Sequence, residues 1–251
     1  MSRINTLSAS DSKVLASVFD PESSSSRAEV IVDPSLPADR RIRDATLLAE
    51  LQVQEKKAVQ LLERFETSPP SERGRRDEVY RSALAILEGV ADNNPLYASV
   101  LNNRAQLRRW YWGDRNLLVQ RKKAPQPQRR TAGEATVKDL RSSISLASPD
   151  RPTDAVSPKQ GRLLAQAYTQ LGAVYHAAAK DVGAVSSDGE KVELSSCADD
   201  PVSWTQERFE EEASRCFYLG GLYGNEVAKA LAVHTNPQAK LCGNIVKEAM
   251  L

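Results

Sequence analysis

The stretch AYTQLGAVYHAAA, residues 167–179, decides the fold, because it spaces two tyrosines, a leucine and a glycine as a helix would. Tyr168, Leu171 and Tyr175 recur at intervals of three and four residues, which predicts that they share one helix face. Gly172 belongs to the same face. A glycine inside a helix costs about 1 kcal/mol relative to alanine, so its presence indicates close approach of a second helix.

The rest of the chain offers partners for this helix and repeats the arrangement. Helical patterns alternate with breaks such as Ser68-Pro69-Pro70 and Asn94-Pro95, and they group into three pairs. The second helix of each pair carries a small residue, a large apolar residue and a third residue at constant spacing. These triplets are Ala83, Leu87 and Val90; Thr136, Leu140 and Ser143; and Ala213, Phe217 and Gly220.

These pairs predict an all-α fold, a tetratricopeptide-repeat helical solenoid of three helix hairpins with long intra-repeat loops and a C-terminal capping helix. The repeats, within residues 41–235, are expected at about 42–95, 96–150 and 158–224. A small hairpin over 185–194 is the one strand pattern. The predicted helices cover 42–66, 77–90, 95–114, 134–147, about 158–180 and 204–224, with a further helix around Asn225–Val233.

The two ends of the chain lie outside these repeats. Residues 1–40 are expected to form an N-terminal extension with a short helix and a Ser/Pro-rich linker, and residues 236–251 the capping helix. The short helix has an apolar stripe that would dock either on its own solenoid or on another protein. That stripe consists of Val14, Leu15, Val18 and Phe19.

Composition places the chain among soluble globular proteins. It has 251 residues, 41% of them hydrophobic, and a formal net charge of +1. Three scattered cysteines without CxxC spacing suggest reduced thiols, and no apolar run is long enough to cross a membrane. We therefore expect a cytoplasmic monomer, with the nucleus as the other compartment open to it.

Motifs for catalysis are missing from the sequence. The chain has two histidines, His176 and His234, and no HExxH, CxxC or glycine-rich phosphate loop. We therefore expect no enzyme activity, no cofactor and no metal site.

Four stretches carry a closer resemblance. They are DSKVLASVFDPES (11–23), ASVLNNRAQLRR (98–109) before Gly113-Asp114, the segment from AYTQLG to EEEASRCF, and NPQAKLCGNIV (236–246). In these stretches the chain resembles the tetratricopeptide repeat protein 36 family. The resemblance implies a non-catalytic adaptor that is linked to chaperones and associated with tyrosine metabolism. The two long loops depart from the family pattern, so the resemblance assigns them no role.

The repeat geometry predicts a groove on the concave face that binds a peptide or helix of a protein partner. First helices of the second and third repeats would line it, and the lining is polar and weakly charged. The predicted groove residues are Asn102, Asn103, Gln106, Arg109, Thr169, Gln170, Ala173 and His176.

Such grooves can grip acidic chaperone tails, but this one lacks the cations to do so. Asn103 takes the place of the clamp asparagine, whereas Gln166 and Gln170 stand where lysine and arginine are needed. In the first repeat the clamp positions fall on Glu55 and Val59 or, in the other register, on Gln52 and Lys56. Any chaperone contact is therefore expected through another surface.

The alternative function is an RNA-associated module that uses the basic loop 115–130. Residues 104–130 hold nine Lys or Arg residues and the aromatic run Trp110–Trp112, a composition found in single-strand binders. An acidic block over 187–212 should lie at the same edge, so the two blocks could neutralise each other, or the basic one could dock an acidic protein. We expect the aromatic run to form helix-end core and nucleic acid not to be the partner.

Overall fold

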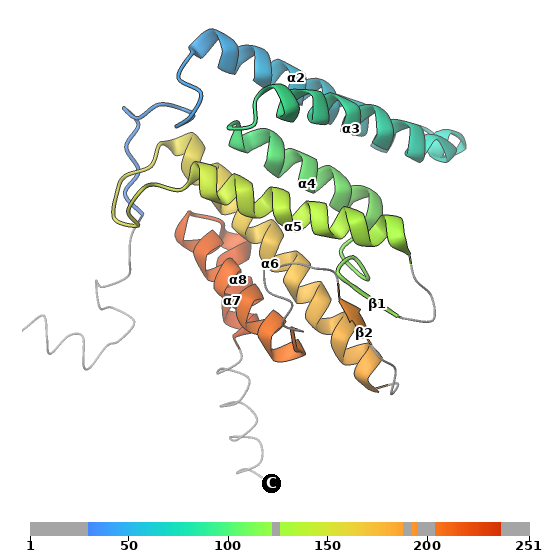
Figure 1. Ribbon diagram of the computed structural model, residues 1–251. Coiled ribbons are helices and arrows are strands. Elements are labelled where there is room, and N and C mark those ends of the chain that lie inside the picture. The colour runs from blue at the N-terminus through green and yellow to red at the C-terminus, as the bar shows by residue number, and fades with distance from the viewer. Residues whose placement is uncertain (1–29, 122–125, 188–191, 195–203, 237–251) are drawn as a thin grey trace, which may run out of the picture. The chain divides into compact units, whose positions relative to one another are not determined.

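In the computed structural model, which describes residues 30–121, 126–187, 192–194 and 204–236, helices pack against one another in chain order (Figure 1). The prediction of an all-α fold is confirmed for these residues, apart from a sheet of two short strands. The elements are α2 (Ala45–Glu66), η1 (Pro70–Arg75), α3 (Arg76–Asn93), α4 (Ala98–Trp112), β1 (Val119–Arg121), α5 (Pro127–Ala147), α6 (Pro158–Ser187), β2 (Val192–Leu194), α7 (Gln206–Leu222) and α8 (Glu226–Thr235).

Short polar residues fix where several helices begin. The Asp44 carboxylate accepts from the backbone N–H groups of Thr46 and Leu47 at the start of α2. Thr205 and Asn225 cap α7 and α8 in the same way. Gly113 ends α4 with a φ of 73°, a conformation in which a side chain would be strained.

Two helices are longer than the sequence predicted. The expectation that α5 begins near residue 134 was wrong, because Pro127 occupies its first turn, where proline's missing N–H costs nothing. Gly133 looked like a loop residue, yet a Cβ there would lie 2.3 Å from the Leu117 carbonyl oxygen, so close packing explains the glycine. The loop expected from residue 181 was also wrong, since α6 runs on to Ser187.

The predicted hairpin over 185–194 is wrong as well, because β2 pairs with β1 instead. The pairing is antiparallel, with Val119 opposite Leu194 and Arg121 opposite Val192. This pairing confirms that the basic loop and the acidic segment meet. Residue Arg115 of the basic loop donates to the buried Asp181 of α6 at 2.5 Å, and the Asn116 N–H donates to the same carboxylate.

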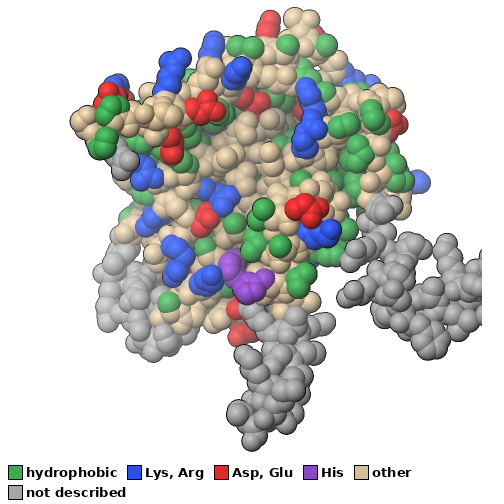
Figure 2. Space-filling view, turned by 180° about the vertical axis from the view of Figure 1, so that it is seen from behind, with side chains coloured by type: hydrophobic (Ala, Val, Ile, Leu, Met, Phe, Trp, Pro, Cys, Tyr) green, Lys and Arg blue, Asp and Glu red, His purple; other side chains and the backbone are tan. Residues whose placement is uncertain are grey.

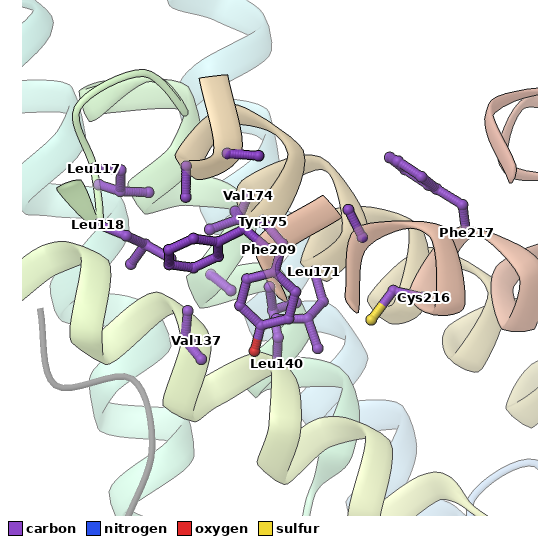
Figure 3. Close-up of a cluster of buried hydrophobic side chains, with 14 of the residues drawn as sticks. Leu117, Leu118, Val137, Leu140, Leu171, Val174, Tyr175, Phe209, Cys216 and Phe217 are labelled. Atoms are coloured by element: carbon purple, nitrogen blue, oxygen red, sulfur yellow. The ribbon is translucent and has the colours of Figure 1, made fainter. Parts of the chain in front are cut away.

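Apolar side chains form two clusters on either side of α4 and α5. One joins α2, α3 and α4, and the other joins β1 with α5 to α8 (Figure 3). In the second cluster a Cβ on Gly172 would lie 2.9 Å from the Phe217 ring, which confirms the close helix approach predicted from the glycine. Cys216 is fully buried there, and burial raises the pKa of its thiol to about 12.

The prediction that the aromatic run at the end of α4 forms helix-end core is confirmed in part, because its rings pack against neighbouring helices but all three residues are only half-buried. Trp110 packs edge-on against Phe65 of α2, and Tyr111 stacks on Tyr80 of α3 at 4.0 Å between ring centroids. Trp112 packs against the cluster of α5 to α8. These rings therefore contact protein on one side and keep part of their surface exposed.

The predictions for both chain ends lie outside the described residues. They concern the N-terminal short helix, most of the linker that follows it, and the capping helix beyond Asn236.

Candidate functional site

Four of the predicted groove residues meet in one hydrogen-bonded network: Asn102, Asn103 and Arg109 of α4 and Gln170 of α6. Gln170 of α6 is buried and donates through Nε2 to Asn102 Oδ1 of α4 at 2.8 Å. Its Oε1 accepts from Arg109 Nη1 at 3.1 Å. Arg109 in turn makes a two-pronged ion pair with Asp114, with N–O distances of 2.7 and 2.8 Å. Gln170 thus couples two turns of α4 to α6.

The network continues from α4 to a buried carboxylate on α2. Asn102 Nδ2 lies 3.5 Å from Asn103 Oδ1, and Asn103 Nδ2 donates to Glu55 Oε1 at 2.9 Å. The other oxygen of Glu55 accepts from the Tyr97 hydroxyl at 2.6 Å and the Ser99 hydroxyl at 3.2 Å. Polar contacts therefore run without a break from α2 across α4 to α6.

Electrostatics at Glu55 follow from its burial. Its side chain is 6% exposed, and this loss of solvent raises the pKa of its carboxyl. The three hydrogen bonds from Tyr97, Ser99 and Asn103 oppose the shift, while the nearby Asp39 carboxylate adds to it. All three contacting donors are neutral, so they hold the carboxylate in place without cancelling its charge.

A cavity of about 120 Å³ opens beside this network, between α2, α3 and α4. Apolar side chains such as Ala58, Val59 and Leu62 form one wall, and Asn103 and Gln106 of α4 form part of the other. Val59 is 43% exposed at this cavity. Gln106 is exposed too, so its amide can reach a molecule in the groove.

The remaining predicted residues of α6 lie toward α7 rather than in the network. The Thr169 hydroxyl donates to the Ala165 carbonyl and faces Gly220, where a Cβ would lie 2.8 Å from its oxygen. Ala173 packs against the cluster of α5 to α8. The His176 ring stands edge-on to Phe217, with ring centroids 6.4 Å apart. The structure therefore joins Asn102, Asn103, Arg109 and Gln170 by hydrogen bonds and places Gln106 beside Asn103 at the cavity. Thr169, Ala173 and His176 lie toward α7 instead.

One face of the described chain is hollowed at its centre, and uncharged side chains and backbone predominate there (Figure 2). Within the described residues, no group of three His, Cys, Asp or Glu side chains is arranged to hold a metal ion. In the same part of the chain, every helix is too short or too polar to cross a membrane. The site therefore offers side-chain amides that form hydrogen bonds, beside an apolar cavity.

Sequence comparison identifies a relative of the chain. The chain is 33% identical to the L-tyrosine degradation gene cluster protein hmgX of Aspergillus fumigatus over 252 residues, which cover 98% of this chain and 92% of hmgX. The chain belongs to the family of hmgX. No family profile matches the chain, and no solved structure matches it either.

Sequence reasoning missed the role of the two carboxylate acceptors in this network, Glu55 and Asp114. A signal for Glu55 was present, because it lies between Leu51 and Ala58 in the apolar stripe of α2. A charge in an apolar stripe is seldom left without hydrogen-bond partners. Asp114 follows the helix-ending Gly113, and nothing in its spacing pointed to Arg109.

Proposed function

We propose that the chain is a non-catalytic adaptor of the tetratricopeptide type, which binds a segment of another protein in the groove beside α2, α4 and α6. The observation that carries the proposal is the hydrogen-bonded network, since it ties α4 to α2 and α6 and fixes the amide of Asn103, which lines an apolar cavity. Fixed amides beside an apolar pocket suit a peptide, which offers backbone polar groups and side chains together.

Burial of the repeat positions supports three tetratricopeptide-like hairpins, α2 with α3, α4 with α5 and α6 with α7. Small residues of the first helices, Ala58 and Ala105, are at most 2% exposed. Every member of the three second-helix triplets is buried as well. These are Ala83, Leu87 and Val90; Thr136, Leu140 and Ser143; and Ala213, Phe217 and Gly220.

The proposed cellular setting is tyrosine degradation, as a protein that binds a component of that process. Membership of the hmgX family supports this setting, because hmgX is described as a tyrosine degradation gene cluster protein. The resemblance to the tetratricopeptide repeat protein 36 family points the same way and adds a chaperone link, which here would use a surface other than the groove.

Affinity capture with matched variants tests the adaptor function. Val59→Arg combined with Gln106→Arg places two charged side chains at exposed positions lining the cavity. The control, Val53→Arg combined with Gln54→Arg, makes the same changes at exposed positions of α2 that do not line the cavity. A partner retained by wild type and control but lost from the groove variant supports the proposal.

Two results would contradict it. Equal capture by all three proteins would place the binding surface elsewhere. If the chain instead binds RNA, with an affinity that falls steeply as salt increases and does not change in the groove variant, the RNA-associated module would be favoured.

A further inference from the structure

We propose that residues 31–44 form a clasp that holds the start of α2 near the end of α5, and that release of this clasp weakens binding in the groove. This inference rests on the proposed function, since it concerns the regulation of the same groove. The clasp directly precedes α2 in the chain, and Figure 1 shows it beside the loop that joins α5 to α6.

A single backbone bridge anchors the first residues of the clasp to this loop. Val32 lies parallel to Val156. The Val156 N–H donates to the Ile31 carbonyl, and the Val156 carbonyl accepts from the Asp33 N–H, both at 2.9 Å. Ile31 and Val32 nevertheless leave more than half of their surface exposed. Because the clasp buries little apolar surface here, the bridge can open at low cost.

Arg40 provides the second anchor, close to α2. Its guanidinium donates to the Ser148 carbonyl at 2.6 Å and pairs with the Asp150 carboxylate. Ala45, the first residue of α2, follows Arg40 so closely that at most about 18 Å of extended chain separates them. While Arg40 is bound, the start of α2 therefore cannot move far from the end of α5. The Asp150 side chain is largely exposed, so salt or a competing ion weakens the pair.

The clasp also reaches the network beside the groove. Asp39 is buried, and its carboxylate accepts from the backbone N–H groups of Arg41 and Ile42. Ile42 packs against the apolar cluster of α2, α3 and α4. The Asp39 carboxylate lies close enough to Glu55 to raise the pKa of that carboxyl. A displaced clasp would therefore disturb the network at Glu55.

The other contacts of α2 allow it to turn when the clasp is released. Most of the residues packed against α2 belong to α3. Direct links from α2 to α4 include the hydrogen bond between Glu55 and Asn103 and, at the far end of α2, the edge-on contact of Phe65 with Trp110. Release would leave that far end in place and free the other, which would misplace Asn103 relative to the cavity wall on α2. A ligand that competes for Arg40 or Asp150 would thus inhibit binding in the groove.

Hydrogen exchange of the full-length chain, measured by mass spectrometry, tests the clasp. Arg40→Ala removes both the hydrogen bond and the ion pair, so we expect the protected amides of α2 to exchange about tenfold faster. Amides of α7, on the other side of α6, should keep their wild-type rates. Arg43→Ala is the control, because Arg43 is an exposed clasp residue that has no hydrogen bond or ion pair with the described residues.

A charge reversal shows whether the pair of Arg40 and Asp150 carries the effect. Arg40→Asp should accelerate exchange in α2 at least as much as Arg40→Ala, because it places two carboxylates together. Adding Asp150→Arg should restore much of the protection, since the two side chains again have opposite charges. Affinity capture then tests the groove: Arg40→Ala should retain severalfold less partner than wild type, and Arg43→Ala should retain as much.

The outcomes separate this inference from the proposed function. Wild-type exchange of α2 in Arg40→Ala, or exchange that rises equally in α2 and α7, would overturn the clasp whatever the groove binds. Faster exchange in α2 with unchanged retention of the partner would overturn its control of the groove and leave the adaptor function intact. If wild type captures no partner, the adaptor function and the control of the groove both fail, and the exchange rates still decide whether the clasp holds α2.

Discussion

The two sides of α6 hold their neighbours by different means. Toward α7, Gly172 leaves room for the Phe217 ring, and the contact is apolar and close. Toward α4, Gln170 bonds to Asn102 and Arg109, and the contact is polar. Size complementarity therefore fixes one side of the helix, and hydrogen bonds fix the other. The polar side continues to an apolar cavity, so it can serve binding as well as stability.

A substitution on the side of α6 that faces α7 should give the largest loss of stability. Gly172→Leu forces a branched side chain against the Phe217 ring and the Ala213 carbonyl, so we expect a loss of about 3 kcal/mol in the free energy of unfolding. Urea denaturation measures it. Gly89→Leu is the control, because a Cβ at this α3 glycine meets nothing within 4 Å, and the change should be neutral or stabilising by up to about 1 kcal/mol. Equal effects at the two glycines would mean that α6 and α7 do not touch at Gly172.

A substitution on the side of α6 that faces α4 should give a smaller loss of stability. Gln170→Ala leaves Asn102 Oδ1 and Arg109 Nη1 without their partner, which costs about 1–3 kcal/mol for buried groups. Urea denaturation again measures the loss, and Gln166→Ala, an exposed glutamine one turn earlier, should change stability by less than about 0.5 kcal/mol. If Gln170→Ala has the same free energy of unfolding as the wild type, the network does not stabilise the fold.

Ionisation of Glu55 should give the smallest effect, and a pH-dependent one. Because burial raises the pKa of Glu55 in the folded chain, folding favours the protonated form. Its contribution to stability is therefore full below the ordinary glutamate pKa of about 4.3 and declines as pH rises through the raised value.

The Tm of wild type should accordingly fall relative to that of Glu55→Gln as pH increases across this window. Glu50→Gln, an exposed position on α2, controls for the general loss of one negative charge. A constant difference between wild type and Glu55→Gln at all pH values would contradict a raised pKa.

The two sides of α6 also differ in how far the sequence predicts them. Gly172 and Phe217 could be matched from spacing alone, because a glycine in an apolar stripe requires a close neighbour. The network could be predicted only in part, since hydrogen bonds depend on which side chains meet across helices. Glu55 was visible as a charge in an apolar stripe, but its three donors come from another helix and the turn before it.

Contacts between distant short segments were the least predictable. The strands β1 and β2 have three residues each, too few for an alternating pattern to stand out, and they pair across two intervening helices. Gly133 follows a run of basic residues, and its sequence neighbours gave no sign that it belongs to a helix. The Leu117 carbonyl that requires a glycine at this position is distant in sequence.

Photo-crosslinking tests the central claim, that the groove binds the partner, most directly. A benzoylphenylalanine replaces one of three exposed glutamines: Gln106 at the cavity, Gln54 on α2 outside the cavity lining, or Gln128 in the first turn of α5. Irradiation of cells should join the partner to the chain from position 106 and not from 54 or 128. Crosslinking from position 128 or 54, with none from 106, would contradict the account.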